Sequence, residues 1–577
     1  MPNRSGSHGR RRVRARWGGR RAAALALGIA VVAAGSLGVA VAELNHSGSG
    51  QQAAVTDPAA GSVSFGASRS ATGADPSSAG RAPAQPETSG ATADASAVPA
   101  TAAPVRVCGN KSILDAGPKT PPLGAIRVPA GHNARVNFRR AHKTYWFAPG
   151  VHTFGSGIYD QIDPGDGATF IGAPSATLDG QHKNYYAFAD QARGVRISYL
   201  TIRNFGTSGG NQEEGVVNHD SASGWKIDHT TIEGNAGAGV MLGNYNTLAY
   251  DCVQNNQQYG FNAYLPSGPR KLVLDHNEIA GNDTYNWEKR EPGCGCTGGG
   301  KFWNVNGAII TYNWFYDNHS VGLWADTNNR GFDIEHNYFQ GNYDVGLVYE
   351  ISYNALIKDN AFIRNGFGQG PQNDGFPNGA IYVSESGADP RVATSYSKTL
   401  AITGNQFTDN WSGVVLWENA NRFCGSPDNS SSGDCTMASP KVARLKTCTR
   451  SNLQGAKPGR SPDYYDLCRW KTQNVQVTHN TFNFNPANIG KSCTIANGCG
   501  FVGVFSEWGS DPSWSPYKGP VVENNITFHQ GNQFADNIYN GPWRFMIHEL
   551  GTIVSWQNWR GQRYHEDTGS ALHPNAG

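Results

Sequence analysis

Large apolar residues and asparagines recur together along the chain at a fixed offset. Each unit begins with an Asn, has a large apolar residue two positions later, and ends with a second Asn five positions after the first. The undisturbed units at Asn313, Asn337 and Asn360 are 24 and 23 residues apart. The units are Asn277/Asn282, Asn313/Asn318, Asn337/Asn342, Asn360/Asn365, Asn405/Asn410 and Asn480/Asn485, with the apolar residues Ile279, Phe315, Phe339, Phe362, Phe407 and Phe482.

This period predicts an all-β fold, a single-stranded parallel β-helix in which every coil stacks its strands on the coil before it. Equivalent Asn side chains would then hydrogen-bond to one another in a ladder, while the Ile and Phe side chains stack inside. The 72 Gly residues, against only 4 Met, favour strands separated by turns over long helices. Leucine-rich repeats share the period, but their leucine consensus and their helix are absent.

Residues 145–188 resemble a known family, and this resemblance also predicts the handedness of the β-helix. The stretches YWFAPGVHTF and ATLDGQHKNYYAF resemble the opening coils of the pectin-lyase-like superfamily. The resemblance covers most of the chain from about Val105 and implies a right-handed parallel β-helix, a pectin-lyase-like solenoid, over residues 105–577. Loop insertions are expected near residues 283–300, 366–400 and 420–472.

Residues 1–42 have the character of an export segment. Eight arginines and no acidic residue accompany the apolar run 22–42, and Ala40 and Ala42 fit a cleavage site before Glu43. The run of 21 residues is also long enough to span a bilayer, so a membrane anchor is the alternative to a signal peptide. The protein is therefore predicted to be secreted, or anchored at the cell surface.

Residues 43–104 consist mainly of Ala, Ser, Gly, Thr and Pro, with Phe65 as their only aromatic residue, which predicts a disordered linker. Without the eight N-terminal arginines, 39 basic residues remain against 45 acidic ones, a formal charge of −6. This balance argues against a nucleic-acid partner.

The ten cysteines, an even number in an exported chain, favour disulfides over metal sites. Cys294 and Cys296, with Cys252 and His276, could bind zinc, but a structural disulfide is the preferred interpretation. Close spacing suggests the pairs Cys424–Cys435, Cys448–Cys468 and Cys493–Cys499.

Two acidic residues occupy the same phase of the repeat. Asp326 and Glu350 each lie four residues after a glycine, Gly322 and Gly346, and are 24 residues apart. Since alternate strand residues face opposite sides and the residue after each glycine is apolar, both carboxylates should point outward. Adjacent coils stack about 4.8 Å apart, so the carboxyl groups should lie roughly 5 Å from each other, as in retaining glycosidases.

Two like charges at this distance raise the pKa of one of them. Glu350, between Tyr349 and Ile351, is the predicted protonated acid, and Asp326, which precedes polar residues, is the predicted ionised nucleophile. The alternative for each is a solvated outward acid with no role in chemistry.

The runs GGGKFW, GLWADTNN and VYEISYN, within residues 298–366, resemble the catalytic region of the β-helix β-xylosidases, glycoside hydrolase family 120. In that family an Asp nucleophile and a Glu acid/base lie about one coil apart, so the resemblance implies these roles for Asp326 and Glu350. Members of the family carry a small β-sandwich insertion, whereas the cysteine-bearing insertion of this chain is predicted to consist of loops.

Other outward residues on nearby coils are predicted to line subsites. Lys301 points outward beside Trp324 if the register is counted from Gly299 and inward if it is counted from Gly300, and a buried lysine is not expected. Tryptophan faces stack on sugar rings, although a packing role is the alternative for each. The predicted substrate-binding residues are Lys301, Trp303, Trp324, His219, Asp220, Glu385, Trp417 and Glu418.

The sequence thus predicts an extracellular retaining glycoside hydrolase that acts on a plant or microbial polysaccharide or oligosaccharide. The first alternative is a polysaccharide lyase or uronan epimerase, which would need an outward base such as Lys301. The second is a non-enzymatic cell-surface glycan-binding protein. No cofactor and no metal site are predicted, with structural or catalytic calcium left open.

Overall fold

The computed structural model describes residues 102–576, apart from 208–214, 266, 291–294, 296, 373–376, 393–395, 397–398, 427–434, 437–438, 506–512, 519 and 549–551. The predicted export segment 1–42 and residues 43–101 of the predicted linker lie outside the described residues. No helix of the described chain has the length and apolar character that crossing a bilayer requires.

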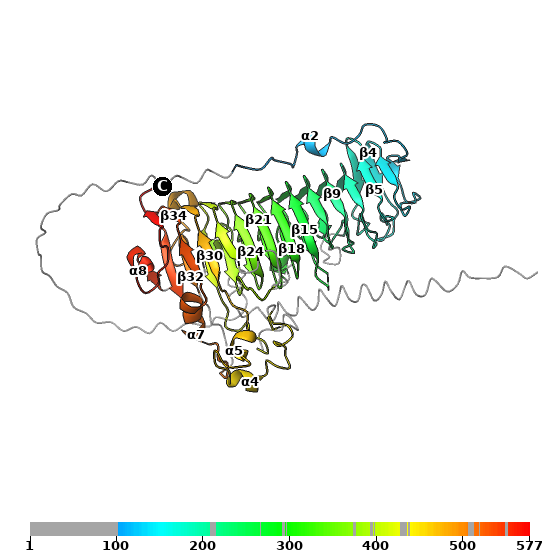
Figure 1. Cartoon of the computed structure of the whole chain (residues 1–577). Helices are drawn as coiled ribbons and strands as arrows, with labels where there is room; N and C mark the ends of the chain where they lie inside the picture. Colours follow the sequence, from blue (N-terminus) through cyan, green and yellow to red (C-terminus); the bar gives the residue numbers. More distant parts are fainter. Residues whose placement is uncertain are drawn as a thin grey trace, which may run out of the picture.

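The described strands stack along one axis in three long sheets, so the molecule is an elongated solenoid (Figure 1). The first sheet contains β1 (Ile126–Val128), β3 (Thr144–Phe147), β5 (Thr169–Gly172), β7 (Arg196–Ser198), β9 (Lys226–Asp228), β12 (Thr247–Ala249), β15 (Arg270–Asp275), β18 (Asn306–Thr311), β21 (Arg330–Glu335), β24 (Tyr353–Lys358), β27 (Leu400–Thr403), β30 (Val475–Thr478) and β33 (Gln533–Ala535). The second contains β2 (Gly131–His132), β4 (Gly150–Thr153), β6 (Ala176–Asp179), β8 (Thr201–Arg203), β10 (Thr231–Glu233), β13 (Cys252–Gln254), β16 (Glu278–Ala280), β19 (Trp314–Tyr316), β22 (Tyr338–Gln340), β25 (Ala361–Ile363), β28 (Gln406–Thr408), β31 (Thr481–Asn483), β34 (Ile538–Asn540) and β37 (Ala571–His573).

The predicted site residues lie on the outer face of the third sheet. Its strands are parallel, except that β36 runs antiparallel to β35 at the C-terminal end. They are β11 (Val240–Met241), β14 (Phe261–Ala263), β17 (Gly300–Phe302), β20 (Leu323–Ala325), β23 (Leu347–Glu350), β26 (Gly379–Ser384), β29 (Ser412–Trp417), β32 (Phe501–Phe505), β35 (Arg544–His548) and β36 (Ile553–Val554). The helices are short: α2 (Lys111–Leu114), α3 (Trp287–Arg290), α4 (Arg450–Gln454), α5 (Tyr464–Leu467), α6 (Pro486–Ile489), α7 (Pro520–Asn524), α8 (Trp556–Arg560), the 3-10 turn η3 (Gly370–Gln372) and the π turn η4 (Asn525–His529).

Two asparagine ladders run along the corners on either side of the second sheet. In the first, the side-chain amide of Asn313 donates to Oδ1 of Asn337 (2.9 Å), and Asn337 donates to Oδ1 of Asn360 (3.0 Å). The predicted stacking of these residues is confirmed. The first ladder is Asn277, Asn313, Asn337, Asn360, Asn405, Asn480 and Asn537, and the second is Asn235, Asn256, Asn282, Asn318, Asn342, Asn365 and Asn410.

One predicted member is not part of a ladder. Asn485 accepts a hydrogen bond from the Ala487 amide (3.0 Å) and caps α6, because the chain leaves the coil at Pro486. The second ladder therefore ends at Asn410, whereas the first ends on a carboxyl group, since Asn537 donates to Oδ1 of Asp567 (3.0 Å).

The apolar partners of the ladders stack inside the solenoid as predicted. Successive rings from Phe315 through Phe339, Phe362 and Phe407 to Phe482 lie 5.1, 4.7, 5.1 and 4.4 Å apart, and all are fully buried. Their nearly parallel planes follow from the constant register of β19, β22, β25, β28 and β31.

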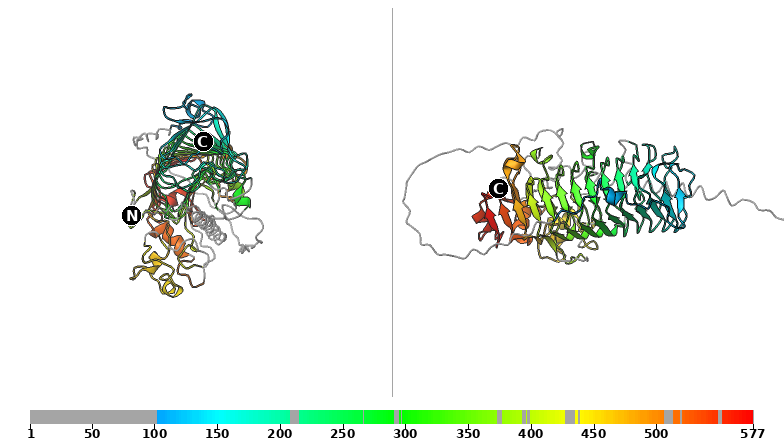
Figure 2. Two further views of the ribbon diagram at one scale, coloured as in Figure 1. Left: turned by 90° about the vertical axis from the view of Figure 1, so that its right-hand side faces the viewer. Right: turned by 90° about the horizontal axis from the view of Figure 1, so that it is seen from above.

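The insertion at residues 420–472 projects from the side of the solenoid and includes α4 and α5 (Figures 1 and 2). It has a small apolar core of its own around Phe423, Leu453 and Tyr465. At its base, Phe423 pairs with Arg469 in an antiparallel bridge, so the two ends of the insertion leave the solenoid side by side.

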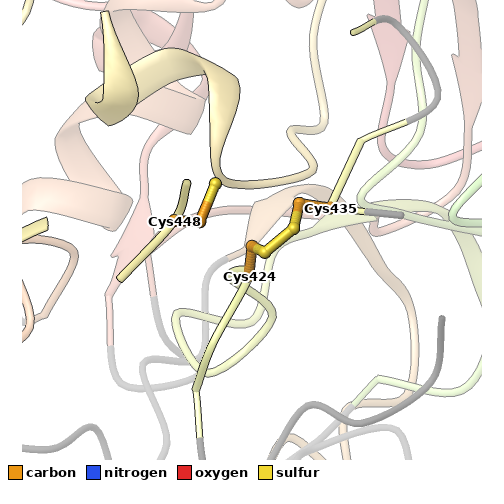
Figure 3. A group of neighbouring side chains, drawn as sticks. All are labelled: Cys424, Cys435 and Cys448. Atoms are coloured by element: carbon orange, nitrogen blue, oxygen red, sulfur yellow. A yellow bond between two sulfur atoms is a disulfide. The ribbon is translucent and has the colours of Figure 1, made fainter. Parts of the chain in front are cut away.

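The predicted pairs Cys424–Cys435, Cys448–Cys468 and Cys493–Cys499 are all formed. Ligand atoms of Cys424, Cys435 and Cys448 lie within 4.8 Å of one another, which suggests a metal site at first sight (Figure 3). Each sulfur is already in a disulfide, however, so this group offers no thiolate to a metal ion.

Cys252 forms a disulfide with Cys108 and is therefore not available as a zinc ligand, and Cys294 and Cys296 lie outside the described residues. The Cys108 disulfide fastens the N-terminal segment to the outer face of the second sheet. There the backbone amides of Val107 and Cys108 donate to the buried carboxylate of Glu278 (2.7 and 2.8 Å).

We expect replacement of a ladder residue to destabilise the solenoid strongly. Asn337→Ala removes the amide that accepts two hydrogen bonds from Asn313 and donates to Ile310 O, Glu335 O and Asn360. Each buried group left without a partner costs about 1–3 kcal/mol. Urea unfolding measures the effect, and Asn306→Ala, at an exposed position of β18, should shift stability by less than about 0.5 kcal/mol. Equal midpoints for the two variants would contradict a structural role for the ladder.

A second prediction concerns pH and the C-terminal end. Burial, and then the Asp567 charge, raises the pKa of Glu566 to about 8, although the Phe534 amide donates to it. The stabilisation from the protonated form is complete below about pH 4.5 and is lost as the pH rises to about 8, at up to about 1.4 kcal/mol per pH unit. Glu566→Gln should therefore raise the melting temperature at pH 9 and leave it nearly unchanged at pH 4. A variant as pH-sensitive as the parent would contradict this assignment.

Candidate active site

The third sheet places two carboxylates at equivalent positions of adjacent coils. In its register, Leu323 pairs with Leu347, Trp324 with Val348 and Ala325 with Tyr349, so Asp326 comes opposite Glu350. Leu323 and Leu347 belong to the core, whereas Val348 packs with Trp324 in a separate apolar cluster outside it. The two acids share this outer face, and the register predicted from Gly322 and Gly346 is confirmed.

Lys301 also lies on the outer face, opposite Trp324 in the register, as the count from Gly299 predicts. Its ammonium group is 3.1 Å from Oδ2 of Asp326, 4.0 Å from the centre of the Trp324 ring, and donates to Gly295 O (2.9 Å). The expectation that a lysine here would not be buried is wrong, because Lys301 is only 3% exposed. The carboxylate, the carbonyl and the indole ring together replace the water that the charge loses.

Glu350 is completely buried and sits between an indole and a guanidinium group. Trp324 Nε1 donates to Oε2 (3.0 Å), and Arg422 Nη1 forms an ion pair with Oε1. Burial has the largest effect and raises the pKa of Glu350, the positive charge of Arg422 lowers it, and the nearby charges of Asp326 and Glu385 raise it, so that the resulting pKa is about 7. This carboxyl group therefore changes its charge near neutral pH.

Arg422 joins two carboxylates from neighbouring coils. Its Nη1 also lies 2.8 Å from Oε2 of Glu385, which accepts further hydrogen bonds from Ser384 Oγ and the Asn419 amide. Burial disfavours the charge of Arg422, but Glu350 and Glu385 outweigh this effect and raise its pKa. Tyr382 is buried beside the cluster, and burial followed by the same two carboxylates raises its pKa far above the ordinary value.

The cluster brings together three carboxyl groups and two cationic side chains. With Asp326, Glu350 and Glu385 all ionised, Lys301 and Arg422 leave one negative charge uncompensated in a buried site. Protonation of Glu350 makes the cluster neutral, which adds to the effect of burial in favouring the protonated form.

The backbone turns sharply beside these acids. Ile351 has a φ of 42° and Glu385 a φ of 44°, both in the left-handed region. This conformation is costly for a β-branched residue such as Ile351 and persists only where surrounding contacts enforce it. The turn aims Glu385 at Arg422, although it lies one position beyond Ser384, which pairs with Glu350.

The other predicted substrate-binding residues lie at different distances from the carboxylate pair. Trp303 is half-buried and packs against Tyr264, with ring centres 5.0 Å apart. His219 and Asp220 follow Val217, whose column continues through Val240, Phe261 and Gly300 to Leu323, four coils away from the carboxylate pair.

Trp417 and Glu418, like the buried Lys301 and Glu385, are not brought to an accessible surface. Trp417 is fully buried against Tyr382, so its faces are not open to a sugar ring. Glu418 is 1% exposed, forms an ion pair with Arg469, and accepts hydrogen bonds from the Thr472 amide and Gln530. It fastens the insertion 420–472 to the solenoid.

Sequence reasoning missed Arg422 and Tyr382. Arg422 is 72 residues from Glu350 and comes from the insertion, where no repeat defines a register. Tyr382 lies in β26 opposite Val348 and could have been found by continuing the Trp324 column through one more strand.

The winding of the chain and the register of its three sheets define a right-handed parallel β-helix, as predicted. Residues 214–396 match the family model described as "Right handed beta helix region". No curated protein matches the chain significantly.

Solved structures match part of the chain. The A-modules of the mannuronan C-5 epimerases AlgE6 and AlgE4 of Azotobacter vinelandii are each 14% identical, with TM-scores of 0.36, and the matches cover 51% of this chain and 83% and 85% of theirs. PfbA, a surface adhesin of Streptococcus pneumoniae, is 10% identical with a TM-score of 0.24, covering 51% of this chain and 77% of the adhesin. None of these matches tests the likeness of residues 298–366 to the β-xylosidases, which stays a prediction.

The indole of Trp324 should report the charge of Glu350. Because its N–H donates to Oε2, its nitrogen resonance should titrate with a midpoint near pH 7, set by the Glu350 pKa. Loss of the signal in Trp324→Phe assigns it. Arg422→Met should raise the midpoint and Glu385→Gln should lower it, since these charges act on Glu350 in opposite directions. No titration of this resonance between about pH 5 and 9 would contradict the assignment.

Proposed function

We propose that the protein is a retaining glycoside hydrolase in which Asp326 is the nucleophile and Glu350 the acid/base. The observation that carries the proposal is the pair itself: two outward carboxylates in register, Asp326 directly after β20 and Glu350 at the end of β23, the latter with its pKa raised to about 7. The resemblance of this region to the β-helix β-xylosidases implies the same roles.

The stacking distance supports retention over inversion. Adjacent parallel strands lie about 4.8 Å apart, so equivalent carboxyl groups are held near the 5–5.5 Å that retaining enzymes use. Inverting enzymes need about 6.5–9.5 Å, which leaves room for a water molecule between the acids.

The environments of the two acids support the division of roles. Glu350 is the buried member and holds a proton near neutral pH, as a general acid must. Asp326 keeps a side-chain exposure of 9%, is ion-paired with Lys301 and accepts a hydrogen bond from Thr327 Oγ1 (2.9 Å). Lys301 and Thr327 therefore orient the Asp326 carboxylate, which lies nearer to solvent than that of Glu350, as a nucleophile needs.

Displacement of Trp324 would open Glu350 to substrate. The indole N–H of Trp324 donates to Oε2 of Glu350, and the Trp324 ring is half-buried, whereas the acids behind it are buried. A sugar ring that takes the place of the indole would bring its glycosidic oxygen to the same carboxyl oxygen. Closing over the bound sugar, Trp324 would also keep water away from the acid during the first step.

The lyase or epimerase alternative rests on Lys301 as base. In the described structure that ammonium group is held by Asp326 and by the Gly295 carbonyl, both of which stabilise its protonated form. A proton-abstracting lysine must be neutral, so this environment favours the hydrolase.

The proposal predicts distinct behaviour for the two carboxylate variants. Asp326→Asn, which keeps the shape at Lys301, should lose all detectable turnover of chromogenic aryl glycosides. Glu350→Ala, in which Arg422 still pairs with Glu385, should lose about 10²–10⁴-fold on natural linkages and much less on aryl glycosides with good leaving groups. Azide should restore its turnover and give a glycosyl azide of retained configuration. The kcat/KM of the parent enzyme should fall above about pH 7.

A matched control is Asp536→Asn, an acid with a 52% exposed side chain at a distant turn, which should keep full activity. NMR of the first-formed anomer decides the stereochemistry. An inverted product would remove Asp326 from the nucleophile role. An unsaturated product absorbing in the near ultraviolet would establish a lyase, and the absence of turnover on all glycans would favour the binding protein.

A further inference from the structure

A line of aromatic side chains leads from the carboxylate pair toward the N-terminal coils on the outside of the third sheet. Asp326 follows Ala325, which pairs with Phe302, so Trp303 comes opposite Asp326 on the preceding coil. Trp303 packs against Tyr264 on the coil before that, with ring centres 5.0 Å apart and planes inclined by 52°. We call Trp303, Tyr264, His219 and Tyr186 the aromatic track.

On the next coil the position opposite Tyr264 is Gly243, so the track has no ring there and resumes with His219 on the coil of Val217. Ser221 Oγ donates to Tyr264 O (3.2 Å), which ties the turn that follows His219 to the turn of Tyr264. His219 in turn stacks on Tyr186, with ring centres 3.7 Å apart and planes inclined by 19°. The column from Val217 to Leu323 takes four coil steps, or about 19 Å at roughly 4.8 Å per coil. This is the length of several linked sugar units.

The position of these rings does not follow from packing of the core. Within the described chain, none of the four belongs to the core of the solenoid or to the apolar cluster around Trp324. Trp303, Tyr264 and His219 are half-buried, and Tyr186 is 8% exposed. Partly exposed rings in a row are the surface on which the apolar faces of sugars stack.

The charges near the track indicate which sugars fit. The acids beside it are Asp220 at its far part and Asp326 at its near end, with Glu350 and Glu385 behind. The cations of the site, Lys301 and Arg422, are each already ion-paired with carboxylates. With Glu350 protonated the cluster is neutral and its cations are paired, so Asp220 supplies the charge beside the track and would repel a uronic-acid chain but not a neutral one.

We propose that the aromatic track is a series of subsites for a neutral, linear polysaccharide that extends from the carboxylate pair toward the N-terminal coils. The proposal rests on the function proposed above and specifies its substrate class as a chain. Trp303 forms the subsite next to the reacting sugar, Tyr264 forms the following one, and His219 with Tyr186 forms the most distant.

Chain length tests the proposal. Neutral linear β-linked oligosaccharides from disaccharide to hexasaccharide, such as fragments of xylan and of cellulose, are titrated against Glu350→Gln and hydrolysed by the parent protein. Affinity and kcat/KM should rise with length. Trp303→Ala should lower both about tenfold for every chain that reaches past the reacting sugar, and Tyr186→Ala should lower them only for the longest.

Tyr312→Ala is the matched control, because Tyr312 stands in a stacked aromatic row with His276 and His336 on another corner of the solenoid. It should leave the length dependence unchanged, and circular dichroism verifies that each variant is folded. Activity without length dependence, or equal losses at all lengths in Tyr186→Ala, would overturn the track while leaving the hydrolase intact.

Length-dependent binding without turnover would support the track and remove the hydrolase. Tighter binding of uronic-acid fragments than of neutral ones, measured with Glu350→Gln, would overturn the assignment of a neutral chain.

Discussion

Backbone hydrogen bonding between parallel strands holds each coil at a fixed distance of about 4.8 Å from the next, and the other regularities of this molecule follow from that distance. It lets one asparagine amide reach the next, as from Asn313 to Asn337, and it brings Phe339 and Phe362 into face-to-face contact. The same spacing holds Asp326 opposite Glu350. Structure and candidate chemistry thus depend on one repeat distance.

The buried charges show how the insertion and the solenoid depend on each other. Arg422 and Arg469 lie at the two ends of the insertion, and they pair with Glu350, Glu385 and Glu418 of the third-sheet coils. Removing one partner of such a pair leaves an uncompensated buried charge, which is strongly destabilising. The disulfide Cys448–Cys468 ends one residue before Arg469, so the covalent link that holds the insertion together also holds this anchor in place.

The features that could be predicted from the sequence are those that follow the repeat of the coils. The ladders, the inward phenylalanines and the register of Asp326 and Glu350 follow the repeat over successive coils, so one alignment predicted most of them. Asn235, Asn256 and Asn537 extend the ladders beyond the predicted units. Arg422 could not be found in this way, because it reaches Glu350 across 72 residues from a segment without a period. The burial of Lys301 also escaped, since it depends on the carbonyl of Gly295 in an irregular loop. Asn485 matched the pattern and still left the ladder, because Pro486 starts a helix.

The asparagine ladders have a consequence for how such a protein changes in evolution. Each ladder residue needs only an identical neighbour above and below, so a whole coil can be gained or lost by duplication or deletion without leaving a buried amide unpaired. Between β20 and β23 the same event would be chemically decisive. One added coil would move the two carboxyl groups from roughly 5 Å to roughly 10 Å apart, past the retaining distance and to the upper limit of the inverting one. In this fold the number of coils between two acids acts as a discrete variable that can convert one stereochemical outcome into the other without replacing a residue of the site.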